Sequence, residues 1–190
     1  MSELSGIHIR RATEDDYAAI GRLSVAAYRA DGQLTAGGSN YGKVLADVAS
    51  RAEAGELLVA TDASGQVLGS VLFVLPGSHY AELSRPGEAE FRMLAVDPAA
   101  QGRGVGQALV EACIDRARAH GASAIVICVR DFSKPAQRLY ARLGFRRVPE
   151  LDWEPLAGVR LLALRLDLAE AATGDDQRTG GSRLEPTSTS

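Results

Sequence analysis

The sequence predicts an α/β protein of the α+β kind, in which helices flank a mixed, mostly antiparallel sheet. Segments with helical periodicity alternate along the chain with short apolar runs typical of strands. Two of those runs are joined by the tripeptide "ASG", a short link that suits an antiparallel hairpin. The chain has 190 residues, 46% of them hydrophobic, which is enough to build one domain around an ordinary core.

The elements are expected in the order β-α-α-β-β-β-α-β-α-β-β. Thr13, followed by three acidic residues, is a typical helix N-cap with an acidic first turn. The expected helices span residues 13–30, 41–55, 105–120 and 134–145. Six of the seven expected strands have residue ranges: 7–12, 56–62, 66–75, 89–96, 123–130 and a last strand at 159–168. The long polar loop at 76–88 is a candidate functional segment.

The domain is expected to cover residues 1–170. Residues 171–190 have almost no large apolar side chains and are predicted to be disordered.

Composition argues against several classes of protein. The net charge of -3 and the scattered Lys and Arg residues do not favour a nucleic-acid binder. No apolar run is long enough to cross a membrane, and the N-terminus lacks the apolar middle of a secretory signal, so a cytoplasmic protein is expected. Cys113 and Cys128 are expected as small buried hydrophobic residues. No His or Cys spacing indicates a metal site.

The stretch "LAVDPAAQGRGVGQALV", residues 94–110, places three glycines directly before a helix. Glycine is a costly residue at such a position, so the bare backbone itself is expected to have a role. Free N–H groups at the start of a helix, with the positive end of its dipole, bind phosphate or pyrophosphate well. The spacing fits neither the P-loop nor the dinucleotide pattern, and an ordinary glycine-rich turn remains an alternative.

Two motifs in the right order resemble the GNAT superfamily of acyl-CoA-dependent N-acetyltransferases, over roughly residues 7–168. The first follows [QR]-x-x-G-x-[GA] after a strand, and is matched by Gln101, Gly104 and Gly106. The second, "SKPAQRLYARLGF", is similar to a late helix pattern of the family, with matches at Ala136, Leu139, Tyr140, Gly144 and Phe145. Ser133 stands where the family usually has Asn. It could contact the cofactor, act as a helix N-cap, or do both.

The resemblance implies a GNAT-like fold whose central parallel strand pair splays apart to hold acetyl-CoA as the acyl donor. The cofactor's pantetheine arm would pair along one strand, and a bulge there would free an N–H near Leu94 or Ala95 for the oxyanion. The implied cofactor-binding residues are Leu94, Ala95, Val96, Gln101, Gly102, Arg103, Gly104, Val105, Gly106, Gln107, Ser133 and Ala136.

The implied reaction is direct transfer of acetyl to a primary amine of a small molecule or peptide, within a ternary complex. Tyr140 would protonate the departing thiolate, although it could instead be a core aromatic. Glu90 is the candidate base. A water relay or a simple solvated carboxylate are the alternatives there.

The acceptor end is expected to include the early helices, the 76–88 loop and the segment at 149–158. Aromatic residues in these parts could contact a cationic acceptor or could simply be packing residues. They are Tyr28, Tyr41, His79, Tyr80 and Trp153. The ribosomal-protein subclass of the superfamily commonly has Glu where this chain has Cys128, so that subclass loses support.

Two other functions fit part of the pattern: a non-catalytic acyl-CoA sensor, and a nucleotide-binding protein for which ATP or NAD would compete at the loop. Whether the chain forms a homodimer stays open.

Overall fold

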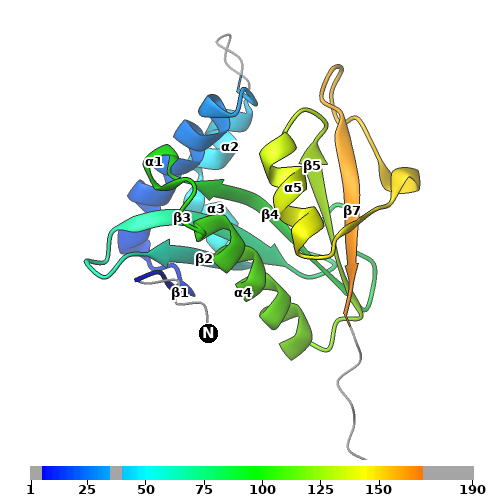
Figure 1. Cartoon of the computed structure of the whole chain (residues 1–190), viewed down its shortest axis with the longest axis horizontal. Coiled ribbons are helices and arrows are strands. Elements are labelled where there is room, and N and C mark those ends of the chain that lie inside the picture. The colour runs from blue at the N-terminus through cyan, green and yellow to red at the C-terminus, as the bar shows by residue number, and fades with distance from the viewer. Residues whose placement is uncertain (1–5, 35–39, 169–190) are drawn as a thin grey trace, which may run out of the picture.

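The computed structural model describes residues 6–34 and 40–168, which form one sheet with helices on both of its faces (Figure 1). The strands are β1 (His8–Arg11), β2 (Glu56–Thr61), β3 (Val67–Val74), β4 (Glu88–Val96), β5 (Ala124–Arg130), β6 (Arg146–Arg147) and β7 (Leu161–Asp167). The α-helices are α1 (Glu14–Ala30), α2 (Tyr41–Ala46), α3 (Val48–Ala54), α4 (Val105–Ala119) and α5 (Lys134–Arg142). Two 3₁₀ turns, η1 (Pro98–Ala100) and η2 (Pro149–Leu151), complete the described elements.

The 7-stranded sheet has the order β1-β2-β3-β4-β5-β7-β6. All neighbouring strands are antiparallel except β4 and β5, which are parallel. Their pairing runs from Glu88 opposite Ala124 to Glu90 opposite Val126 and then stops, while both strands continue. The two strands therefore separate at the centre of the sheet. The expected mixed sheet with a central splayed pair is confirmed.

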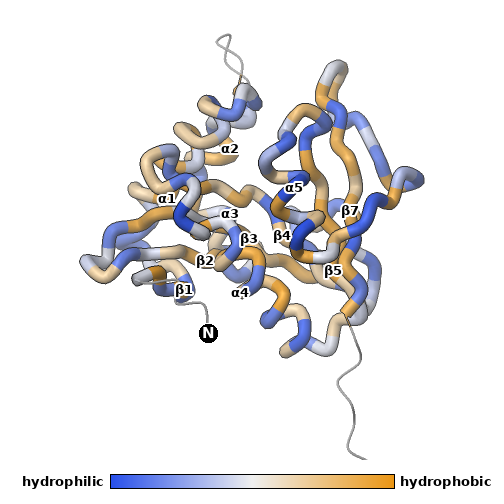
Figure 2. The backbone as a smooth tube through the Cα atoms, viewed as in Figure 1, coloured by the Kyte–Doolittle hydropathy of each residue, from blue (hydrophilic) through white to orange (hydrophobic). Residues whose placement is uncertain are grey.

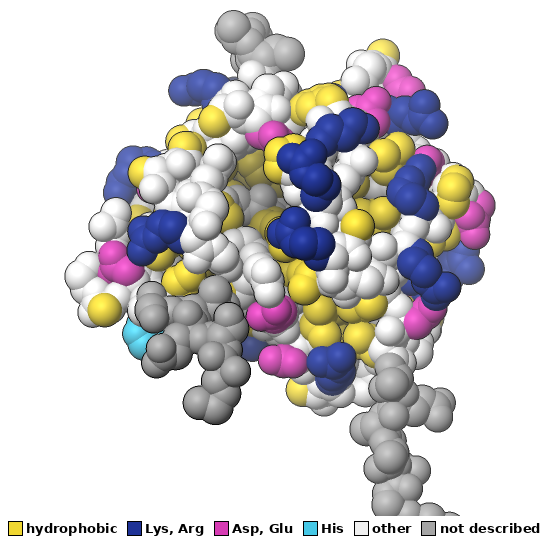
Figure 3. Space-filling model, in the orientation of Figure 1, with side chains coloured by type: hydrophobic (Ala, Val, Ile, Leu, Met, Phe, Trp, Pro, Cys, Tyr) yellow, Lys and Arg dark blue, Asp and Glu magenta, His cyan; other side chains and the backbone are white. Residues whose placement is uncertain are grey.

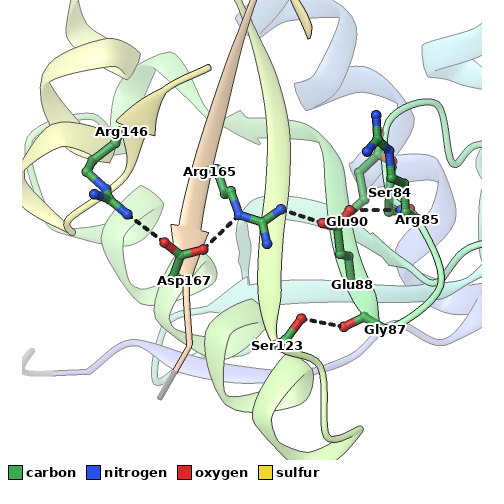
Figure 4. Close-up of polar contacts among 9 residues, drawn as sticks. All are labelled: Ser84, Arg85, Gly87, Glu88, Glu90, Ser123, Arg146, Arg165 and Asp167. Carbon is green, nitrogen blue, oxygen red and sulfur yellow. Dashed lines mark hydrogen bonds and ion pairs between the residues drawn. The ribbon is translucent and has the colours of Figure 1, made fainter. Parts of the chain in front are cut away.

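An ion-pair network holds the paired end of β4 and β5 (Figure 4). Arg165 of β7 reaches across β5 and forms an ion pair with Glu88 of β4. The same guanidinium contacts Asp167 at 2.7 Å, and Asp167 also pairs with Arg146. These contacts link β4, β7 and β6 at the end where β4 and β5 are paired. β4 and β5 are therefore held together at that end and separate at the other.

The two faces of the sheet carry different helices. α1 and α3 cover one face, around a cluster that includes Ile20, Val48 and Leu72. α4 and α5 cover the other face, around a larger cluster that includes Leu109 and Phe91. Figure 2 shows the apolar stretches gathered in the central strands. The gap between β4 and β5 lies between the two layers of helices, so helices of both layers can contribute to the site.

Two expected helices have different bounds. The helix expected at 41–55 is broken at Asp47 into α2 and α3, because the Asp47 side chain accepts the Ser50 N–H at 3.2 Å and caps a new helix. The helix expected at 134–145 ends at Arg142. Gly144 then adopts φ 91 and Phe145 N–H donates to the Tyr140 carbonyl, which closes the helix end. The tail predicted to be disordered, 171–190, lies outside the described residues.

Candidate active site

Strand β4 contains a β-bulge at the point where it leaves β5. Ser70 of β3 pairs with Ala95, but Leu72 pairs with Arg92, so two β4 residues, Met93 and Leu94, face one β3 residue. Met93 has φ 55, which is uncommon for a residue with a side chain. A bulge leaves a backbone N–H without its ladder partner, which is the feature expected near Leu94 or Ala95.

The glycine-rich loop that follows β4 ends at the first turn of α4. Gly102 and Gly104 have φ 76 and 83, and Gly104 is the N-cap residue of the helix. A Cβ at Gly102 would meet no atom within 4 Å, so the left-handed backbone accounts for glycine at this position. Gly106 is helical, and a Cβ there would lie 3.4 Å from Leu139 of α5. This distance is at the limit of ordinary van der Waals contact, so Gly106 lies directly against α5.

The N–H groups of the first turn of α4 are free to bind an anion. The first hydrogen bond within this helix runs from the Ala108 N–H to the Gly104 carbonyl at 3.0 Å. The preceding N–H groups therefore have no partner within the helix, and the dipole adds positive potential at the same place.

A cleft of about 640 Å³ joins the bulge to this loop. Its walls are the C-terminal end of α1, the open end of β4, the start of α4 and one side of α5. The predicted cofactor-binding residues that line it are Leu94, Ala95, Val96, Gln101, Gly102, Gly104, Val105, Gly106, Gln107, Ser133 and Ala136. Arg103 is exposed and is not among the lining residues.

Sequence reasoning missed the α1 wall of the cleft. Asp31, which follows the last turn of α1, lies opposite α5, and its carboxylate accepts the Ser133 hydroxyl at 2.8 Å and the Gln33 amide at 2.7 Å. The Ser133 hydroxyl therefore binds across the cleft and does not cap α5. A contact between residues 102 positions apart leaves no local pattern in the sequence.

Tyr140 lies in an aromatic cluster between α5 and β4. Its ring centroid is 5.9 Å from that of Phe91 and 5.6 Å from that of Phe145, and the residue is 5% exposed. Burial raises the pKa of Tyr140 above its usual value. The phenol therefore keeps its proton at neutral pH. Tyr140 follows Leu139 and lies one helical turn after Ala136, and both of these residues line the cleft.

Glu90 lies on β4, at the last paired position before the separation, and is 1% exposed. Its Oε2 accepts the backbone N–H groups of Glu82, Leu83 and Ser84, each at 3.0 Å. Figure 4 shows the contact with Ser84. The carboxylate therefore anchors the 76–88 loop, a role that the sequence alone did not indicate.

The expected acceptor aromatics include two pairs of neighbouring rings. The rings of Tyr28 and Tyr41 are 5.8 Å apart, and those of His79 and Tyr80 are 5.3 Å apart. Trp153 donates its indole N–H to Cys128 Sγ at 3.4 Å.

The two cysteines differ in burial. Cys113 is buried, while Cys128 is only partly buried. Burial raises the pKa of Cys128 to about 11, so its thiol is neutral at physiological pH.

Positive charge borders the cleft on α5. Lys134, Arg138 and Arg142 are exposed at four-residue intervals, and Arg142 lines the cleft. Figure 3 shows dark blue Lys and Arg side chains gathered over this part of the surface. An anionic ligand in the cleft would meet favourable potential from this side.

Within residues 6–34 and 40–168, no cluster of His, Cys, Asp or Glu is arranged to hold a metal ion. Over the same residues, no helix has the length and apolar character that crossing a membrane requires.

A sheet that opens at a parallel strand pair, with a bulge and a helix N-terminus in one cleft, is the arrangement that the resemblance to acyl-CoA-dependent transferases implied. The Acetyltransferase (GNAT) family profile matches residues 15–145. The chain belongs to this family. It is an acyltransferase domain, and acetyl-CoA is the donor that the family uses.

Relatives and solved structures agree with this assignment. A mycothiol acetyltransferase from Pseudarthrobacter chlorophenolicus is 36% identical over 140 residues, which cover 70% of this chain and 39% of that protein. The chain thus spans about two fifths of the length of that relative. The protein yncA from Salmonella typhimurium, solved with its cofactor acetyl-CoA, is 26% identical, with a TM-score of 0.62 and coverage of 90% of this chain and 99% of that one. A GCN5-related N-acetyltransferase from Kribbella flavida is 29% identical, with a TM-score of 0.61 and coverage of 86% and 98%.

Proposed function

We propose that the chain is an N-acetyltransferase that transfers acetyl from acetyl-CoA directly to a primary amine of a small molecule or peptide, in a ternary complex. The observation that carries the proposal is the cleft itself, because it joins an anion-binding loop to a bulged, unpaired strand edge. Such an edge can pair with the amides of pantetheine, while the loop N–H groups bind the pyrophosphate.

Different groups of the chain would carry out different steps of the reaction. An N–H freed by the bulge, at Leu94 or Ala95, donates to the thioester oxygen as the amine attacks, and stabilises the tetrahedral oxyanion. When that intermediate collapses, the C–S bond breaks and the amide forms. The sulfur leaves as a thiolate, and Tyr140 supplies its proton.

Glu90 is proposed as the base that takes the proton of the amine. Since Oε2 already accepts three N–H groups, Oε1 is the oxygen left for this step. Glu90→Gln tests the role sharply, because the amide oxygen can still accept the loop N–H groups but cannot take a proton at neutral pH. We expect kcat to fall about a hundredfold, as is typical for loss of a general base. If the variant keeps an activity near that of the wild type, Glu90 is not the base, and a water relay takes the proton of the amine.

The function as a whole is tested by ligand-dependent stability followed by turnover. Acetyl-CoA at about 100 times its Kd should stabilise the fold by about 2.7 kcal/mol, while ATP and NAD should give no shift. Release of free thiol from acetyl-CoA is then measured with a panel of primary amines. Binding without thiol release from any amine would indicate an acyl-CoA sensor. Stabilisation by ATP or NAD would indicate a nucleotide-binding protein.

A further inference from the structure

The side chain of Arg51, on α3, is fully buried, and no carboxylate among the described residues forms an ion pair with it. It is 0% exposed. Its Nη2 donates to the Leu45 carbonyl at 2.7 Å and its Nη1 lies 4.0 Å from Met93 Sδ, while Nε has no hydrogen-bond partner in the described part of the chain. Burying a guanidinium without a counter-charge is strongly unfavourable. A negative group bound close to this guanidinium would therefore be strongly stabilised.

The guanidinium lies beside the proposed reaction centre. Met93, which it contacts, is the residue with φ 55 at the β4 bulge, and the next residue, Leu94, lines the cofactor cleft. Arg51 reaches this position from the opposite face of the sheet to α4 and α5. Its charge is therefore on the side of α1 and the 76–88 loop, which were expected to form the acceptor end.

Three tyrosines from separate segments, Tyr28, Tyr41 and Tyr80, lie on the same side of the sheet as Arg51. Burial lowers the pKa of Arg51, and Tyr28, Tyr41 and Tyr80 are close enough to act against that shift. Tyr28 also lines the cleft, and its ring is 5.8 Å from that of Tyr41. Phenol hydroxyls can donate hydrogen bonds to a carboxylate, so this tyrosine cluster adds donors to the positive potential of the guanidinium.

Three carboxylates near this charge, those of Asp47, Glu82 and Glu90, already have other partners. Asp47 accepts the Ser50 N–H at 3.2 Å and the Ser50 hydroxyl at 2.7 Å. Glu82 forms an ion pair with Arg92 at 2.6 Å, and Arg92 also donates to the Tyr80 carbonyl at 3.0 Å. Glu90 accepts the three loop N–H groups described above. Among the described residues, Arg51 is thus a fully buried positive charge on this side of the sheet with no carboxylate in an ion pair with it.

We propose that the amine acceptor also carries a carboxylate, as an α-amino acid does, and that this carboxylate binds at the tyrosine cluster over Arg51. The inference rests on the proposed N-acetyltransferase function. Tyr28 and Tyr41 donate hydrogen bonds to the carboxylate, and Arg51 supplies the counter-charge from behind them, where the low local dielectric preserves its effect. An acceptor that lacks the carboxylate leaves the charge of Arg51 without a counter-charge, so the chain discriminates against that acceptor.

The test compares α-amino acids with their α-carboxamides and with the corresponding decarboxylated amines, by thiol release from acetyl-CoA. In the wild-type chain we expect kcat/KM for the acid to exceed that for either analogue by at least about tenfold. In Arg51→Met the preference should fall to near one, mainly through a higher KM for the acid, with stabilisation by acetyl-CoA unchanged. Arg51→Lys should retain part of the preference. Arg118→Met, on an exposed side chain, is the matched control and should retain all of it.

Each remaining outcome overturns a defined part of the proposal. If the amides or the decarboxylated amines react as fast as the acids in the wild type, the carboxylate site is refuted while the transferase function stands. If no amine of any kind releases thiol, the proposed function itself fails. The comparison of the acids with their analogues in the wild-type chain does not depend on the folding of any variant. If Arg51→Met does not fold, Tyr28→Phe and Tyr41→Phe carry the variant test, and an unchanged preference in both would refute the site.

Discussion

Replacing Tyr140 by Phe should separate its chemical role from its packing role. The ring packs against Phe91 and Phe145 with centroid separations of 5.9 and 5.6 Å, and Phe preserves these contacts. We expect the free energy of unfolding to change by less than about 1 kcal/mol. Loss of the proton donor should lower kcat about a hundredfold, which corresponds to about 2.7 kcal/mol in activation free energy.

The pH dependence gives a second check on Tyr140. Burial raises the pKa of its phenol, so the acid form persists through neutrality, and ionisation of Tyr140 should cause no loss of activity below about pH 10. The assay is steady-state thiol release together with acetyl-CoA binding, and Tyr17→Phe on α1 is the control. If Tyr140→Phe weakens acetyl-CoA binding as much as it lowers kcat, the residue acts by packing and the acid role is refuted.

Two further predictions concern the loop and the start of α1. Gly104→Ala should destabilise the fold by about 1–3 kcal/mol through its positive φ, and should also weaken acetyl-CoA binding. Gly121, at the other end of α4, also has a positive φ, of 68, and Gly121→Ala is the control. This variant should lose stability but bind acetyl-CoA as the wild type does. If calorimetry shows that both variants bind acetyl-CoA equally well, the glycine-rich loop does not bind the cofactor. Hydrogen bonding to Arg10 lowers the pKa of Asp16 from 3.8 to about 2, so this ion pair should add about 1–2 kcal/mol of stability above pH 4 that is lost as pH falls towards 2. Urea unfolding of Asp16→Asn should lack that pH dependence, and an unchanged dependence would mean that the pair does not stabilise the fold.

Local signals in the sequence were enough to predict much of the fold and one side of the cleft. The glycines and the α5 motif are short patterns, and the residues that they mark meet because each follows directly from a neighbouring strand. The break at Asp47 was missed because the apolar periodicity continues across it. Only the hydrogen bond from Ser50 to the Asp47 side chain shows that a second helix begins there.

The parts that sequence reasoning missed depend on contacts between distant segments. Asp31 meets Ser133 across 102 positions, and Arg51 meets Met93 across 42. In the sequence, an arginine in a short helix is expected at the solvated surface, and only the fold shows that Arg51 is buried. The acceptor side is built almost entirely from such contacts. This is why the cofactor cleft was more predictable than the acceptor site.

Strand β4 explains how the two halves of the reaction can be arranged independently. Successive side chains of a strand point to opposite faces. Phe91 therefore packs with Tyr140 on the side of α4 and α5, while Arg92 binds the Tyr80 carbonyl on the other side. The bulge interrupts this alternation just beyond Arg92, at the point where the strand leaves β5. Changes in the acceptor wall can then alter substrate preference without moving the proposed acid, because the two groups share only the backbone of one strand.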